Sequence, residues 1–145
     1  MVGEVKVRVR YEETDQMGMV YHGKYFVWFE VGRTELFRDF GLPYTVLEAN
    51  KIYLPVVEAH CQYKTSARYD DELIIKTRVN KLSGVRIGFD YDIVNTDGQL
   101  IAHGGTTHAF LNEHGKPVNV KKAAPWLWDK LVNVVEADNL FKEVR

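Results

Sequence analysis

Residues 11–23 read YEETDQMGMVYHG, a charged loop that leads directly into the longest helical pattern of the sequence. Before the loop, Val5 to Tyr11 alternates apolar with charged residues, as a strand with one buried face does. After it, Tyr25 to Phe40 repeats apolar residues at helical spacing, and these residues reach several sides of the helix. The loop therefore joins a strand to a helix that the rest of the chain must cover.

The sequence after this helix predicts a short helical turn, four strands and a closing helix behind Pro125. The predicted strands are Val57 to Tyr63, Glu72 to Leu82, Val85 to Asn95 and Gln99 to Leu111. Pro55 restricts the start of the first of these to a sheet edge or a bulge. One strand, one long helix and four strands in hairpin succession predict an α+β fold with an antiparallel sheet.

Composition and charge limit the class of protein. A chain of 145 residues fits one domain, residues 1–145, and its net charge of −1 provides no basic surface for nucleic acid. Charges near the N-terminus and the lack of an apolar run of about 18 residues argue against a signal peptide and an integral membrane segment. We therefore expect a cytoplasmic protein. The single Cys61 alternates with apolar residues and is expected to face the core.

Asp15 lies in the loop just ahead of the long helix. From position alone, an aspartate in a turn most often bonds nearby backbone N–H groups. The helix start, however, offers backbone N–H groups without intrahelical partners and the positive end of the helix dipole. Between Val20 and Gly23 there is no Ser, Thr, Asp or Asn to cap them. These N–H groups are therefore free to receive negative charge on a ligand.

The order of residues in this loop also resembles a known family. The loop follows the pattern Tyr-x-x-Thr-Asp-x-x-Gly-x-Val-Tyr-His-x-x-Tyr, which is continued by Phe29-Glu30 and Arg33-Thr34-Glu35. This pattern is similar to the signature of hotdog-fold acyl-CoA thioesterases of the 4-hydroxybenzoyl-CoA thioesterase type. The resemblance is greatest to the branch associated with the bacterial Tol-Pal system. Residues 67–71 and 102–110 resemble later segments of the same family. The resemblance implies a hotdog fold, in which an antiparallel sheet wraps around one long helix. It also implies homodimers or homotetramers with active sites at the subunit interface.

The resemblance further implies roles for the loop residues. Asp15 matches the family's catalytic carboxylate, and a carboxylate can act either as a base toward water or as a nucleophile. The backbone N–H of His22, with that of Gly23 beside it, matches the donor that stabilises the oxyanion of the thioester carbonyl. The His22 side chain is either a polar residue facing solvent or a second catalytic group that positions substrate or transfers a proton.

Three cations at strand ends, Lys64, Arg68 and Arg86, are candidates to bind the phosphates of coenzyme A, although each is also explained as a surface charge. No metal or redox cofactor is predicted. Two histidines, His103 and His108, lie five residues apart on one strand and should therefore point to opposite faces of the sheet.

Three charged residues near the loop and on the helix are expected to have structural roles or none. Glu13 should face solvent if the chain stays extended beside Asp15. Glu30 and Arg33 lie three residues apart on the helix, a spacing at which they can form an ion pair.

Together these observations predict an enzyme that hydrolyses short or medium aliphatic, or small aromatic, acyl-CoA thioesters to free acid and CoA. The preference rests on Trp28, Phe29 and Phe37, which crowd the helix and leave little room for a long acyl tail. Two alternatives stay open. One is a non-catalytic module that binds acyl-CoA or acyl carrier protein, and the other is a hotdog dehydratase that acts on hydroxyacyl thioesters.

Overall fold

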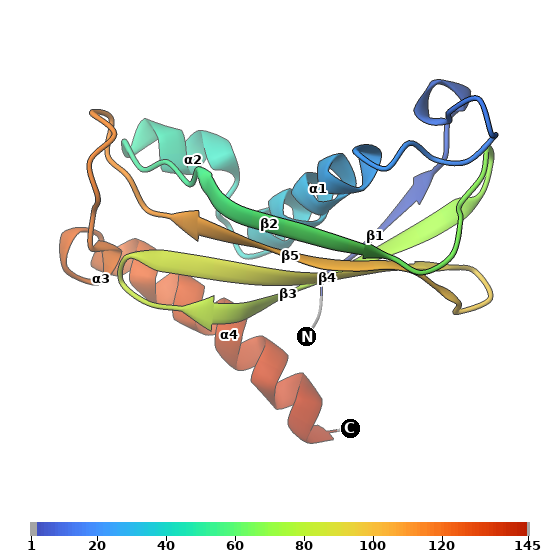
Figure 1. Ribbon diagram of the computed structural model, residues 1–145. Coiled ribbons are helices and arrows are strands. Elements are labelled where there is room, and N and C mark those ends of the chain that lie inside the picture. The colour runs from blue at the N-terminus through green and yellow to red at the C-terminus, as the bar shows by residue number, and fades with distance from the viewer. Residues whose placement is uncertain (1–2, 145) are drawn as a thin grey trace.

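The computed structural model describes the backbone of residues 3–144 and the side chains of residues 3–137. The elements in chain order are β1 Gly3–Arg8, the 3-10 turn η1 Tyr11–Glu13, α1 Lys24–Asp39, α2 Tyr44–Ala49, β2 Val56–Tyr63, β3 Glu72–Leu82, β4 Arg86–Asn95, β5 Leu100–Ala109, α3 Val120–Ala123 and α4 Pro125–Val144. In this part of the chain, five strands form one antiparallel sheet in the order β1-β3-β4-β5-β2. Helices α1 and α2 lie on one side of the sheet, and α3 and α4 lie on the other (Figure 1). The predicted α+β arrangement is confirmed.

The long helix and the strands after β2 lie within two residues of where periodicity placed them, and β3 matches its predicted bounds. The first strand ends earlier than predicted, because the chain leaves β3 after Val9. There the Val9 N–H donates to the carbonyl of Asp71, and Val9 accepts from the Asp70 N–H. Tyr11 therefore begins a tight turn instead of ending a strand. None of the described helices is long and apolar enough to span a membrane.

Helix α1 packs closely on the inner face of the sheet. The ring of Phe29 stacks on the ring of Tyr91, with 4.3 Å between centroids and 7° between planes. Two glycines permit this approach. A Cβ at Gly104 would lie 2.7 Å from the Phe29 ring, and one at Gly32 would collide with the hydroxyl of Thr77. The backbone at Gly32 and the ring of Phe29 thus rest directly on the sheet. These contacts fix the distance between α1 and the sheet, and with it the position of the N-terminal end of the helix.

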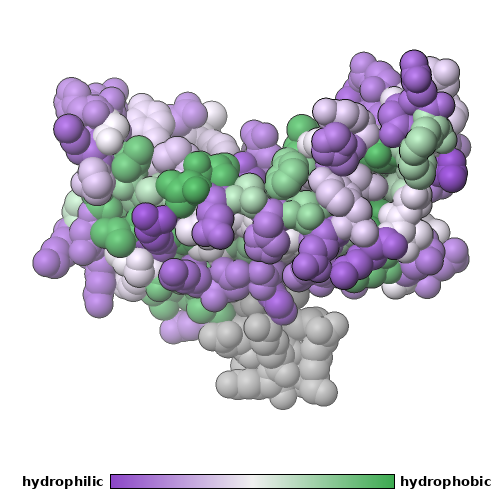
Figure 2. Space-filling model, in the orientation of Figure 1, coloured by the Kyte–Doolittle hydropathy of each residue, from purple (hydrophilic) through white to green (hydrophobic). Residues whose placement is uncertain are grey.

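Strand β2 lies at the edge of the sheet and is mostly exposed. It pairs only with β5, and no described strand pairs with its outer edge. Val56, Val57 and Tyr63 are each about half exposed, whereas Cys61 is partly buried against the core. Cys61 therefore packs against the core as expected, although it is only partly buried, while most of the strand is exposed because nothing described covers it at that edge. Figure 2 shows hydrophobic residues gathered on the face of the molecule where β2 lies.

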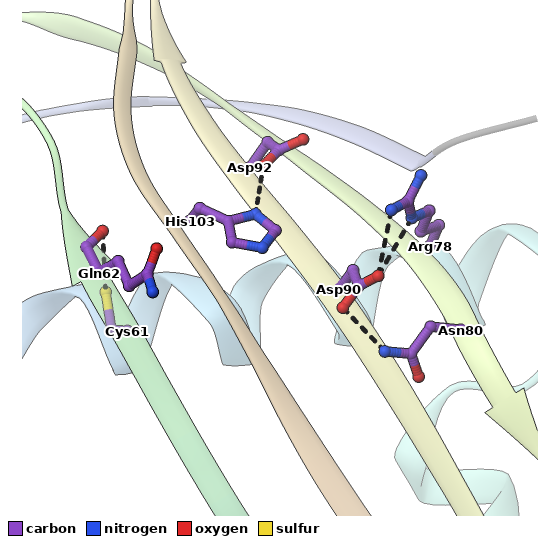
Figure 3. Close-up of polar contacts among 7 residues, drawn as sticks. All are labelled: Cys61, Gln62, Arg78, Asn80, Asp90, Asp92 and His103. Atoms are coloured by element: carbon purple, nitrogen blue, oxygen red, sulfur yellow. Dashed lines mark hydrogen bonds and ion pairs between the residues drawn. The ribbon is translucent and has the colours of Figure 1, made fainter.

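The outer face of the sheet carries polar pairs. Nδ1 of His103 lies 2.7 Å from Oδ1 of Asp92, and Asp90 accepts hydrogen bonds from Arg78 and Asn80 (Figure 3). His108, in contrast, is fully buried on the inner face. The two histidines thus point to opposite faces, as predicted. Within the described residues, no group of three His, Cys, Asp or Glu side chains is placed to hold a metal ion.

Candidate active site

The loop that carries Asp15 is a tight turn anchored to the segment after β2. The N–H of Asp15 donates to the carbonyl of Met19 over 2.8 Å, and the N–H of Gly18 donates to the carbonyl of Asp15 over 3.0 Å. Gly18 adopts φ +76°, in the left-handed region that glycine enters without strain. The N–H of Val20 donates to the carbonyl of Ala67 over 2.9 Å. These bonds fix the position of Asp15 relative to the end of the sheet.

The two carboxylate oxygens of Asp15 have different surroundings. Oδ1 accepts hydrogen bonds from the N–H groups of Met17 and Met19, at 2.8 and 3.3 Å. This is the turn-stabilising arrangement that position alone suggested. Oδ2 has no hydrogen bond to any described residue, and the side chain is exposed. One oxygen therefore holds the loop while the other is free to accept a proton or to attack a carbonyl, so the two readings of Asp15 are compatible.

Asp15 lines a pocket of about 250 Å³ at the N-terminal end of α1, together with His22, Tyr25 and Tyr63. Burial raises the pKa of Tyr25 to about 12, which keeps its phenol neutral. A larger and mainly apolar pocket, of about 480 Å³, lies between α2 and the start of β2. It contains no residue with a predicted catalytic role, so the chemistry places the candidate site in the smaller pocket.

The N-terminal end of α1 has free backbone donors. Gly23 precedes the helix and no side chain caps the end. The Lys24 N–H donates to the carbonyl of Tyr21, and the Tyr21 N–H to that of Glu13. The N–H groups of His22 and Gly23, by contrast, have no acceptor among the residues described. The two N–H groups proposed from the resemblance are thus available to a ligand.

Glu13 corrects an expectation from the sequence. It is only 7% exposed and not solvated, because the 3-10 turn η1 rotates it inward where an extended chain would leave it outside. Its Oε2 lies 2.7 Å from Nζ of Lys24, and Oε1 accepts from the N–H of Arg10 over 2.7 Å. Burial acts to raise the pKa of Glu13, but the bonds from Lys24 and Arg10 outweigh it and lower the pKa. Glu13 therefore ties the start of the loop to the first residue of α1.

The expected ion pair between Glu30 and Arg33 is not formed. Arg33 is buried, at 9% exposure, and its Nε donates to the phenol of Tyr44 over 3.2 Å, whereas Glu30 is exposed. The spacing permits the pair, but α2 brings a phenol to the guanidinium and Glu30 stays in solvent.

The structure brings together two of the three candidate cations. Lys64 lines the Asp15 pocket, and Arg68 forms a backbone bridge with Met19 in the Asp15 loop. Arg86 begins β4 opposite Ala109, at the end of the sheet away from this loop. Within one chain, Arg86 therefore does not share the pocket with Asp15.

Sequence reasoning assigned no role to Tyr63. Its phenol donates to the carbonyl of His22 over 2.9 Å, and its ring meets that of Tyr25 edge-on at 5.2 Å. The two partners of this hydrogen bond are 41 residues apart, so no local pattern could have indicated it.

The fold and this pocket define a hotdog protein with a carboxylate beside a free helix N-terminus. Residues 9–133 match the thioesterase-like superfamily. YneP of Bacillus subtilis, named as a candidate acyl-CoA thioesterase, is 36% identical over 86% of this chain and 91% of its own length. The acyl-CoA thioester hydrolase YbgC of Escherichia coli O6:H1 is 36% identical over 66% of this chain and 71% of its own. The solved structure of a DHNA-CoA thioesterase from Staphylococcus aureus superposes with a TM-score of 0.89, at 32% identity over 95% of this chain and 93% of that one.

The chain belongs to the thioesterase-like superfamily and has the hotdog fold. The prediction of an enzyme of the thioester hydrolase class is confirmed by this membership.

Proposed function

We propose that the protein is an acyl-CoA thioesterase that hydrolyses its substrate in the Asp15 pocket. The observation that carries this proposal is the free Oδ2 of Asp15 in a pocket with His22, at the uncapped end of α1. Relatives named as acyl-CoA thioesterases support the substrate class. Lys64 in the same pocket and Arg68 beside it supply positive charge for the phosphates of CoA.

The proposed reaction has two possible routes from the same geometry. As a base, Oδ2 of Asp15 takes a proton from water while the water oxygen attacks the thioester carbonyl, and the resulting intermediate breaks its C–S bond to give the free acid and the CoA thiolate. As a nucleophile, Oδ2 attacks the carbonyl itself, expels the CoA thiolate and leaves an anhydride that water hydrolyses. Both routes place negative charge on the carbonyl oxygen, where the N–H groups of His22 and Gly23 stabilise it. Such a donor typically contributes about 3 kcal/mol to lowering the barrier.

Replacing Asp15 with asparagine tests this proposal. The amide oxygen can still accept the bonds from Met17 and Met19, so the loop should keep its shape while the anionic Oδ2 is lost. We expect kcat to fall at least about 100-fold with little change in KM. Asp39→Asn, at the exposed far end of α1, is the matched control. Wild-type turnover in Asp15→Asn would refute the proposal.

The acyl preference is proposed as short or medium aliphatic, or small aromatic. The Asp15 pocket is small, and the side chains of Trp28, Phe29 and Phe37 are buried between α1 and the sheet, where they fill space that a long acyl tail would need. The test is kcat/KM for acetyl-, butyryl-, hexanoyl-, benzoyl- and palmitoyl-CoA under one condition. A steady rise through palmitoyl-CoA would refute this preference. Release of an enoyl thioester in place of free thiol would indicate a dehydratase.

The oligomeric state is proposed from the exposed edge of β2. Its backbone groups and the half-exposed side chains of Val56 and Val57 can be covered by a second copy of the chain. We expect a homodimer or homotetramer, and light scattering should show a mass well above 16.8 kDa. A fully active monomer at assay concentration would contradict this. The acyl carrier protein partner, the Tol-Pal branch and the cytoplasmic location stay predictions.

A further inference from the structure

The peptide that joins His22 to Gly23 is held by one hydrogen bond from a distant strand. Tyr63, the last residue of β2, donates its phenolic hydrogen to the His22 carbonyl over 2.9 Å. Because α1 begins only at Lys24, this carbonyl lies outside the helix. No other described residue donates to it.

This bond acts on one of the two donors that the proposed reaction needs, the Gly23 N–H. A peptide unit is planar, so the direction of the His22 carbonyl fixes the direction of the Gly23 N–H on the other side of the same peptide. Gly23 has φ −69° and ψ −20°, already helical, and its N–H therefore points out of the helix end. A hydrogen bond to the carbonyl also polarises the peptide and strengthens its N–H as a donor.

Without such a bond, the His22–Gly23 peptide could easily rotate so that its carbonyl and its N–H exchange directions. Glycine adopts positive φ almost as readily as negative φ, so rotation of the His22–Gly23 peptide meets little steric resistance. A larger residue would resist the rotation, but a Cβ at position 23 would lie 2.8 Å from Cε2 of Tyr21. A Cβ at this position would force the exposed Tyr21 ring to move, and with glycine in place the peptide has to be fixed by another residue.

The phenol of Tyr63 is placed to fix it. Its ring meets the buried Tyr25 of α1 edge-on, with 5.2 Å between centroids and 70° between planes. Burial raises the pKa of Tyr63, and the neighbouring Cys61 raises it further, so the hydroxyl stays protonated and able to donate through neutral and mildly alkaline pH.

We propose that Tyr63 is a positioning residue, which holds the His22 carbonyl away from the forming oxyanion so that the Gly23 N–H, on the same peptide, faces it. This role rests on the proposed thioesterase function. Tyr63 does not itself react. It acts on the transition state through a backbone peptide, and its loss should change turnover more than ground-state binding.

The first test compares Tyr63→Phe, which keeps the ring and removes only the hydroxyl, with Tyr53→Phe at the other end of the sheet as control. Removing an oxyanion donor outright costs about 100- to 1,000-fold in kcat, and a donor that is only misdirected should cost less. We expect kcat of Tyr63→Phe to fall about tenfold, with KM within about twofold and an unchanged melting temperature. Tyr53→Phe should match the wild type.

A second measurement separates positioning from general damage to the pocket. A trifluoromethyl ketone analogue of acyl-CoA forms an oxyanion-like adduct, whereas a thioether analogue has no carbonyl. Tyr63→Phe should weaken binding of the ketone about tenfold and leave the Kd of the thioether unchanged. Equal weakening of both analogues, or of neither, would overturn the role of Tyr63.

The results also separate a failure of the proposed role of Tyr63 from a failure of the proposed thioesterase function. An active wild type whose Tyr63→Phe variant keeps full kcat refutes the role of Tyr63 alone. A wild type that releases no thiol from any acyl-CoA refutes the proposed function and this role with it.

Discussion

Replacing Gly32 with alanine should push α1 away from the sheet. A Cβ at this position would collide with Oγ1 of Thr77 and lie 2.9 Å from Cγ2 of Ile75. Overpacking of this kind costs about 1–3 kcal/mol, and the better helix propensity of alanine offsets about 1 kcal/mol of that. Because two atoms would lie closer than 3.0 Å, we expect the upper part of this range, about 2–3 kcal/mol, and therefore a net fall of about 1–2 kcal/mol in the free energy of unfolding. In a chain of this size, the melting temperature should drop by roughly 2–8 °C.

Thr77 provides the control for this prediction. Its Oγ1 is buried and has no hydrogen-bond partner in the described structure, so Thr77→Ala removes the colliding atom without breaking a hydrogen bond. In urea unfolding, the double variant Gly32→Ala/Thr77→Ala should recover about half of the loss, because the contact with Ile75 remains. An unchanged stability of Gly32→Ala, or strictly additive effects of the two substitutions, would show that α1 does not rest on the sheet at this point.

Two further predictions concern buried charges. Burial lowers the pKa of His108, so its protonation favours the unfolded chain: stability should be complete above about pH 6.5 and fall as the pH drops below it. The difference between the urea midpoints at pH 5 and pH 8 should shrink in His108→Gln. It should persist in the control His114→Gln, because the His114 side chain is 77% exposed. A wild type that is equally stable at both pH values would contradict this prediction. Lys24→Met removes the cation 2.7 Å from the buried carboxylate of Glu13 and should cost about 3 kcal/mol of unfolding free energy, partly recovered by adding Glu13→Gln. A loss below about 0.5 kcal/mol would show that Glu13 needs no such partner.

Local periodicity predicts the five strands, the helices α1 and α4 and the helical turn at α2, but not η1 or α3. The alternation in β3 and the apolar repeat of α1 are properties of neighbouring residues, and both elements form nearly where they were expected. Burial was less predictable, since it depends on what the fold places over a strand. Val57 alternates with polar neighbours, yet it is about half exposed, because β2 is an edge strand with nothing described over it.

The residues of the candidate site also fall into two groups: those that the local sequence indicates and those whose contacts depend on the complete fold. Asp15 and the uncapped helix start were visible in one continuous stretch of sequence. Glu13 was misread because a single turn, η1, reverses the direction of its side chain. Arg33 was assigned the partner that its helical spacing allows, whereas the structure gives it Tyr44 from the next helix. Tyr63 had no local signal, because its contact with the loop exists only after the sheet has formed.

The unequal surroundings of the two Asp15 oxygens mean that folding and turnover depend on different atoms of one side chain. Oδ1 accepts two backbone hydrogen bonds that stabilise the loop, and an asparagine supplies an oxygen at the same position. On the proposed mechanism, only the atom at the Oδ2 position decides whether the thioester is broken. A single codon change from aspartate to asparagine would therefore convert a hydrolase into a receptor that captures acyl-CoA and releases it intact. Such a pseudoenzyme would share the fold, the pocket and nearly the whole sequence of its active parent.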